Sequence, residues 1–173
     1  FMVLPILTPL FIEIGASIKE IGVIMAVMGF TVIALEMPTG GLADEIGRKK
    51  LFLYSLILSI LSLLVLFFYP SIYGSIVSMF FWGAAISVSS GTITAWFVET
   101  FNQSEGEMTL QEGYAKVGFR TNLMGASGAL ICSLVVYLGI LQKIDNLILY
   151  RGLLLAAIAC YMLIFMIALV WVK

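Results

Sequence analysis

Histidine is absent from this chain of 173 residues, and charged side chains are few. Without imidazole, the chain has no histidine ligand for a metal, no histidine general acid or base, and no histidine proton relay. Charged residues make up 11% and the net charge is -1, so nothing indicates nucleic-acid binding. The two cysteines, Cys132 and Cys160, stand singly in apolar runs. We interpret them as small packing residues rather than as a disulfide or redox pair.

Hydrophobic residues are abundant instead, at 62% of the sequence, which is far above the average of soluble domains. A membrane-spanning helix needs about 20 mainly apolar residues. The chain therefore predicts an all-α, polytopic transmembrane bundle, residues 1–173, with spans over 1–15, 21–39, 51–68, 75–98, 113–140 and 147–172. Because Phe1 is not Met and already lies in an apolar run, we expect a fragment whose first span is truncated.

Two of these spans are separated only by Tyr69-Pro70-Ser71, in a stretch that is otherwise uncharged and too long for one crossing. At the first outer turn, Ser17 is a plausible helix N-cap and Glu20 lies in the favoured first turn. The acidic stretch 102–112 is interpreted as a solvated loop.

The most polar and most patterned segment is Glu36–Lys50, with the sequence EMPTGGLADEIGRKK, here named the signature segment. Apolar runs on both sides predict a tight loop between two spans. Gly41 allows close helix approach, Asp44 can cap a helix or pair with a cation, and Gly47 supplies a turn. The basic triplet that ends the segment favours a cytoplasmic location.

The order Gly41-Leu-Ala-Asp44-x-x-Gly47-Arg48-Lys49-Lys50 resembles the signature loop between the second and third helices of the major facilitator superfamily. The preceding Glu36-x-Pro38-Thr39-Gly40 strengthens the resemblance, whereas Glu45 stands where a basic residue is common. The resemblance implies the N-terminal six-helix half of a transporter, multi-pass in a plasma or inner membrane.

The same resemblance implies an ion pair between Arg48 and Glu99, an acidic residue at the cytoplasmic end of the fourth span. In such transporters this cluster holds one conformation closed on the cytoplasmic side. The alternative is a static anchor pair. The expected cluster comprises Gly41, Asp44, Gly47, Arg48, Lys49, Lys50 and Glu99.

Four further charged residues are candidates for a cavity or for coupling, because charges within spans are costly. Glu36 is expected to pair with a basic group of the cytoplasmic loops, or else to be a proton- or substrate-linked site. Glu13 is an interfacial charge or a contact at the cavity mouth. Arg120 lines the cavity, extends to the interface, or joins Glu36 and Glu99. Arg151 is interfacial or lines the outer vestibule.

Small residues recur on two spans and predict faces for close helix packing. On the fourth span they are Gly83, Ser87, Gly91 and Ala95, and on the fifth, in phase with Arg120, they are Thr121, Gly125, Ala129 and Ser133. Phe80, Phe81 and Trp82 precede Gly83, where drug/proton antiporters of the superfamily often carry an arginine. This departure weakens the proton-antiporter subtype.

The resemblance implies secondary active transport of a small organic solute by alternating access, with efflux as the expected direction. No enzyme activity, cofactor or metal site is expected. The expected partners are the lipid bilayer, a small-molecule substrate and a missing C-terminal half of the same transporter. The alternative is a non-transporting membrane sensor or scaffold that uses the same fold.

Overall fold

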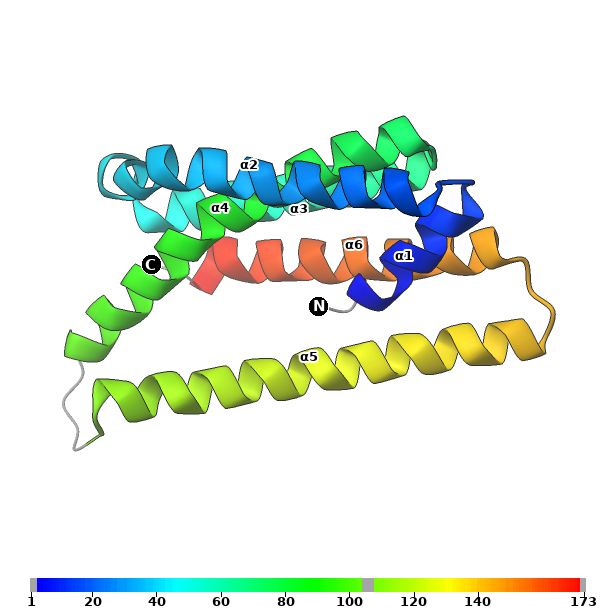
Figure 1. Cartoon of the computed structure of the whole chain (residues 1–173). Helices are drawn as coiled ribbons and strands as arrows, with labels where there is room; N and C mark the ends of the chain where they lie inside the picture. The colour runs from blue at the N-terminus through cyan, green and yellow to red at the C-terminus, as the bar shows by residue number, and fades with distance from the viewer. Residues whose placement is uncertain (1–2, 104–107, 172–173) are drawn as a thin grey trace.

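The computed structural model describes residues 3–103 and 108–171, apart from the side chains at positions 38, 40–44, 91 and 171. These residues form an all-helical bundle, which confirms the predicted fold class (Figure 1). The helices follow one another as α1 (Leu4–Glu13), α2 (Ile18–Ile46), α3 (Arg48–Phe68), α4 (Ile72–Gln103), α5 (Leu110–Leu141) and α6 (Asn146–Trp171).

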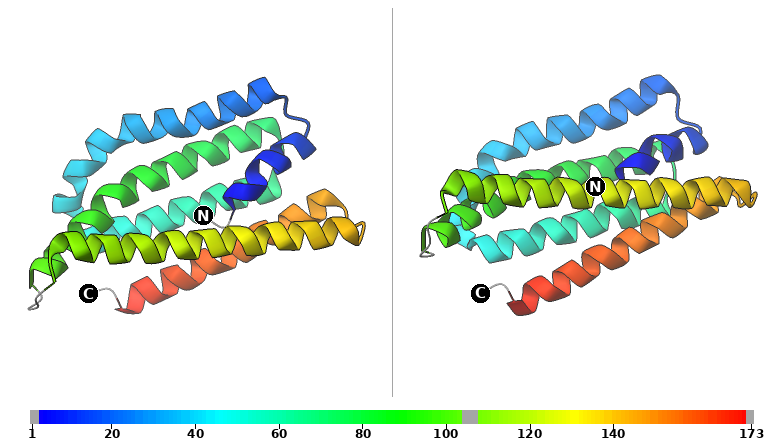
Figure 2. Two further views of the ribbon diagram at one scale, coloured as in Figure 1. Left: turned by 60° about the horizontal axis from the view of Figure 1, so that its bottom comes forward. Right: turned by 90° about the horizontal axis from the view of Figure 1, so that it is seen from below.

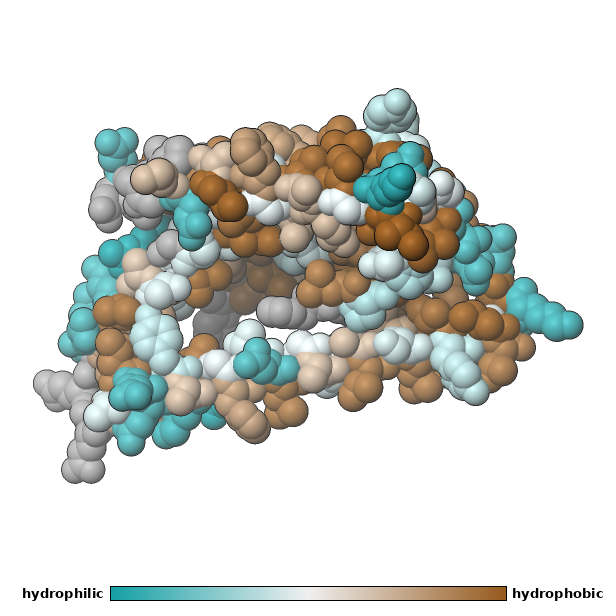
Figure 3. Space-filling model, viewed as in Figure 1, coloured by the Kyte–Doolittle hydropathy of each residue, from teal (hydrophilic) through white to brown (hydrophobic). Residues whose placement is uncertain are grey.

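Five helices in the described part of the chain are long and apolar enough to cross a membrane, and α1, with 10 residues, is shorter. Hydrophilic residues gather mainly toward the two ends of the bundle, and hydrophobic residues cover most of its middle (Figure 3). The α2–α3 turn, the end of α4, the start of α5 and the end of α6 lie at one end of the bundle (Figure 1), which is called the signature end. The other is called the opposite end.

Two local predictions are confirmed. Helix α3 stops at Phe68 and α4 starts at Ile72, so Tyr69-Pro70-Ser71 does divide the uncharged stretch. Ser17 caps α2 through a capping box with Glu20.

The acidic stretch 102–112 was expected to be a loop, and the structure corrects this at both sides. Helix α4 continues to Gln103, and α5 begins at Leu110. Thr109 and Glu112 form a second capping box, so Glu112 accepts a hydrogen bond from the Thr109 backbone N–H at 2.9 Å as well as facing solvent. A capping carboxylate satisfies a backbone donor that the helix itself leaves unpaired.

The signature segment is not the tight loop that its polarity suggested. Helix α2 continues through it as far as Ile46, and α3 begins at Arg48, which leaves Gly47 as the whole connection. Leucine, alanine and glutamate are good helix formers, so residues 42–46 keep their backbone hydrogen bonds within the helix. The polar character marks where α2 leaves the apolar region rather than where it ends.

The central packing is that of α4 against α2 on one side and α3 on the other, and α3 also packs on α6 (Figure 2). The small face of α4 packs closely, as predicted, and the helix that it meets is α2: a Cβ added to Gly83 would lie 2.6 Å from the Met28 carbonyl oxygen. The hydroxyls of Ser87 and Thr39 form a hydrogen bond across the same contact, at 3.0 Å. Close backbone approach and hydroxyl bonding are what hold helices together where lipid is the solvent.

Helix α5 packs less closely than its neighbours. Its small-residue stripe was expected to face other helices, but Thr121 and Ser133 are exposed and Gly125 and Ala129 are half-buried. The helix meets α4 near its start and α6 near its end, and it contacts α1 between them. Of the two cysteines, Cys132 on α5 is buried as predicted, whereas Cys160 on α6 is exposed.

Candidate functional site

The turn at the signature end depends on one residue. Gly47 has φ 92° and ψ 138°, a backbone conformation that residues with a Cβ rarely adopt. It ends α2 and directly precedes Arg48, so the chain reverses without any intervening loop. The predicted role of Gly47 as a turn residue is confirmed, and the turn places the basic triplet at the first turn of α3.

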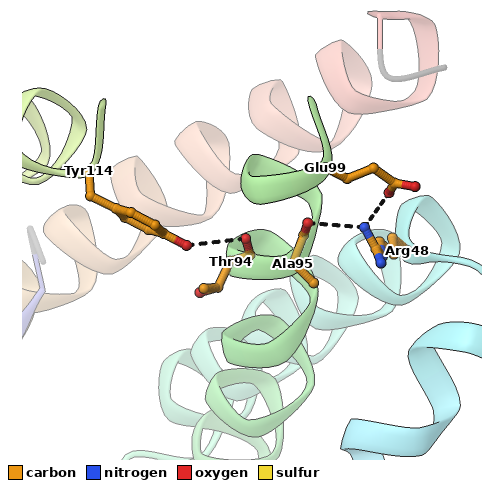
Figure 4. A network of polar contacts seen from close by, with 5 residues as sticks. All are labelled: Arg48, Thr94, Ala95, Glu99 and Tyr114. Carbon is orange, nitrogen blue, oxygen red and sulfur yellow. Dashed lines mark hydrogen bonds and ion pairs between the residues drawn. The ribbon is translucent and has the colours of Figure 1, made fainter. Parts of the chain in front are cut away.

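Arg48 joins α3 to the last turns of α4 (Figure 4). Its Nη1 donates to the Ala95 carbonyl oxygen at 3.0 Å and forms an ion pair with Glu99 Oε2. Ala95 and Glu99 are four residues apart on one helix face, so a single guanidinium reaches both. The expected Arg48–Glu99 ion pair is therefore present. The side chains are 28% and 54% exposed, so water screens much of their attraction.

The electrostatics of this end explain why these contacts form. Arg48, Lys49 and Lys50 occupy the first turn of α3, next to the partial positive charge of a helix N-terminus, and that turn has no acidic residue. Glu99 offsets this unfavourable arrangement for Arg48. Lys49 Nζ instead donates to the Leu169 carbonyl oxygen at 3.1 Å, near the C-terminus of α6, where a cation is favourable.

Helix α5 reaches the same stretch of α4 through aromatic contacts. The Tyr114 hydroxyl donates to the Thr94 carbonyl oxygen at 3.5 Å, one residue before the carbonyl that Arg48 contacts (Figure 4). The Tyr114 ring lies 4.8 Å from that of Phe97. A Cβ on Gly113 would lie 2.9 Å from Phe101 Cε2, so glycine permits this approach. Helices α3 and α5 thus donate hydrogen bonds to two consecutive backbone carbonyls of α4.

Comparison with known protein families agrees with this geometry. A family model described as Major Facilitator Superfamily matches residues 1–171. The chain belongs to the major facilitator superfamily. No curated protein and no solved structure matches it. Membership in this superfamily assigns the chain to membrane transport of small solutes rather than to the enzymes.

The signature segment also contains two predicted site residues, Gly41 and Asp44. Their backbone belongs to α2, but their surroundings lie outside the described part of the structure. The Lys50 side chain is exposed and has no hydrogen bond or ion pair within residues 3–103 and 108–171. The cluster is therefore described at Gly47, Arg48, Lys49 and Glu99.

The expected pairing of Glu36 with a basic group of the cytoplasmic loops is wrong for the described residues. Its carboxylate is exposed on α2 and forms no ion pair with any of the three basic residues after Gly47. The reason is the uninterrupted helix, which places residues 36 and 47 about three turns apart, roughly 16 Å along the axis. Glu36 as a proton- or substrate-linked site remains a proposal.

The other candidate charges lie on α1, α5 and α6. Glu13 accepts a hydrogen bond from Asn146 Nδ2 at 3.1 Å, which ties α1 to the start of α6. Arg120 is exposed on α5 and has no ion pair within the described chain. Arg151 lies with its guanidinium 6.0 Å from the centre of the Phe67 ring. The structure does not bring these residues together with the Arg48–Glu99 pair.

Sequence reasoning missed most of the acceptors in this site. The carbonyls of Thr94, Ala95 and Leu169 belong to residues whose side chains play no part, so nothing in their identity marks them. Tyr114 was detectable in principle, since an aromatic residue next to Gly113 in the first turn of a helix suggests a close contact.

Proposed function

We propose that this chain is the N-terminal bundle of a secondary active permease of the efflux type, which moves a small organic solute by alternating access. In this proposal the Arg48–Glu99 pair is a latch that favours the state closed at the signature end, and that end faces the cytoplasm. The basic triplet at residues 48–50 supports the orientation.

The observation that carries the proposal is the reach of Arg48 from α3 onto α4. It contacts a backbone carbonyl and a carboxylate that lie on one turn, so a movement of the α4 end against α3 breaks both contacts together. Partly exposed ion pairs contribute about 1 kcal/mol or less, which is a suitable size for a contact that must repeatedly break. A population shift between two states needs differential contacts of this kind.

An apolar groove supports the proposal that the solute is organic and has substantial hydrophobic surface. It has a volume of about 470 Å³ and contains no charged residue. Its lining comes from α2 and α4, namely Val23, Ala26, Val27, Phe30, Thr31, Ala34, Leu35 and Phe80. Pockets of a few hundred cubic ångströms with one or two polar groups are typical of small-molecule sites.

A second six-helix bundle is part of the proposal. Transporters of two repeats place the substrate between them, near the middle of the bilayer. The sparse packing of α5 supports this part of the proposal. Helix α5 carries Arg120 and exposed Thr121 and Ser133, and exposing such residues to lipid costs free energy that contact with a second bundle would avoid.

The test uses the full-length transporter in proteoliposomes, with a panel of organic solutes and four proteins: wild type, Arg48→Gln, Glu99→Gln and Lys50→Gln. Solute movement and reactivity of a cysteine probe at the signature end are measured together. We expect both latch variants to increase probe reactivity and to lower solute-driven transport. Lys50→Gln, which removes the same charge from a side chain without a described partner, should behave as wild type.

Unchanged transport and probe reactivity in both latch variants would show that the pair is a static anchor. If no solute moves in any protein, although folding is intact, the sensor or scaffold alternative gains support.

A further inference from the structure

Arg151 is a cation without an acceptor at the opposite end of the bundle. It lies five residues after the start of α6, about 7.5 Å along the helix axis. Its Nε is buried and has no hydrogen-bond partner among the described residues. The guanidinium faces the ring of Phe67 on α3 at 6.0 Å. The residue as a whole is half-buried, so the rest of the guanidinium is accessible. A partly buried cation without an ion pair is costly, so this guanidinium requires an anion or another acceptor.

The carboxylates of this end are already engaged elsewhere. Glu13 accepts from Asn146, and Glu20 accepts from Ser17. Asp145 Oδ1 accepts from two backbone N–H groups at the start of α6, at 2.9 and 3.1 Å. No described carboxylate forms an ion pair with Arg151. The acceptor therefore comes from outside this part of the chain.

The side of α6 on which Arg151 lies indicates where that acceptor is. Leu149 points toward α5, since a Cβ on Gly139 would lie 2.7 Å from its Cδ2. Arg151, two residues on, points toward α3 on the other side of α6. Ile148 and Leu155 lie about one turn to either side of Arg151 on α6, and Phe68 follows Phe67 on α3, so exposed apolar side chains, at 66%, 49% and 65% exposure, border this position. Such a border suits acyl chains rather than water.

We propose that Arg151 and Phe67 form a binding site for the phosphate of a phospholipid head group, in the leaflet at the opposite end. The planar guanidinium can donate two parallel hydrogen bonds to phosphate oxygens, and the ring of Phe67 holds it in place. The depth of about 7.5 Å is within reach of the head-group region, because a long basic side chain extends toward it. The acyl chains then lie against Ile148 and Leu155.

The experiment measures retention of phosphatidylglycerol by the purified full-length protein, by native mass spectrometry during lipid titration. Wild type is compared with Arg151→Met, Arg151→Lys and Phe67→Leu. Loss of a bidentate charged contact should weaken the tightest lipid-binding event about tenfold in Arg151→Met. Arg151→Lys, which keeps the charge but loses the fork, and Phe67→Leu should give intermediate values.

Lys143→Gln is the matched control, since it removes an exposed cation from the turn just before α6 and leaves Arg151 and Phe67 unchanged. It should bind the lipid as wild type does. Equal retention by wild type and all three variants of Arg151 and Phe67, each with a wild-type melting temperature, would overturn the proposal. So would displacement of the lipid by millimolar inorganic phosphate, because the site would then recognise a soluble anion.

Discussion

At the scale of single residues, the signature end depends on one backbone conformation and one guanidinium. Gly47 sets the direction in which α3 leaves α2, and Arg48, the next residue, makes use of that direction to reach α4. A displaced turn would therefore remove the ion pair without any change to its two side chains.

Gly47→Ala should destabilise the protein by about 1 to 3 kcal/mol, because alanine is strained at φ 92°. The measurement is the melting temperature in detergent. Gly152→Ala is the matched control: its added Cβ would meet nothing within 4 Å, and α6 is helical there, so stability should be unchanged or slightly higher. Equal melting temperatures for the two variants would contradict the strained turn.

A double-mutant cycle of Arg48→Gln and Glu99→Gln should give a coupling free energy of unfolding of about 1 kcal/mol or less, because both side chains are partly exposed. Chemical denaturation in detergent at low and high salt provides the measurement, and the coupling should fall as salt increases. A coupling above 3 kcal/mol, insensitive to salt, would mean that the pair is a buried structural contact and unsuited to repeated opening.

How far the residues of the site were predictable depends on what kind of group each contact uses. Arg48 and Glu99 were predictable because the resemblance to the signature loop of the superfamily implies this pairing. Lys49 was assigned to the cluster, but its acceptor, the Leu169 carbonyl, lies 120 positions later and has no side-chain signature. The failure at Glu36 has a different cause, since its pairing was inferred from proximity along a loop that is in fact a helix.

At the scale of helices, the face that α4 presents to α2 decides how close the two helices come. Gly83 lies against the Met28 carbonyl and the Thr31 side chain. In lipid, where apolar surface alone gives no net attraction between helices, such contacts contribute much of the association.

Gly83→Ala should lower stability by about 1 to 3 kcal/mol, because the new methyl group forces α2 away from α4. Gly118→Ala, on α5, is the control, since an added Cβ there meets nothing within 4 Å. Thermal unfolding of the two variants in the same detergent makes the comparison. If Gly83→Ala has the same melting temperature as wild type, the small face of α4 is not a close packing surface.

Helix positions were predictable largely because apolar run length and turn residues determine them, as at Tyr69-Pro70-Ser71. The helix ends beyond the apolar runs were not predictable, because residues 40–46 and 99–103 contain polar side chains and are still compatible with a helix. Close packing was predicted correctly for α4, whose small face meets α2. For α5 the same pattern failed, since small residues indicate that close approach is possible but not which helix approaches.

At the scale of the whole molecule, the two ends are expected to lie on opposite sides of the membrane. Single cysteines introduced by Lys50→Cys and Gln142→Cys, in a background with Cys132→Ala and Cys160→Ala, test this with a membrane-impermeant thiol reagent. In intact cells Gln142→Cys should react and Lys50→Cys should not, and both should react after permeabilisation. The reverse pattern would place the signature end outside.

The length of α4 adds a dependence on the membrane itself. Its 32 residues extend over about 48 Å, against a hydrocarbon core of about 30 Å, so its last turns stand in the head-group region or beyond. Glu99 lies in that part, and lipids with longer tails would draw it toward a less polar layer. There the same two charges attract each other more strongly. In the proposed latch mechanism, the balance between the two conformations would therefore depend on bilayer thickness, even when neither solute nor protein sequence has changed.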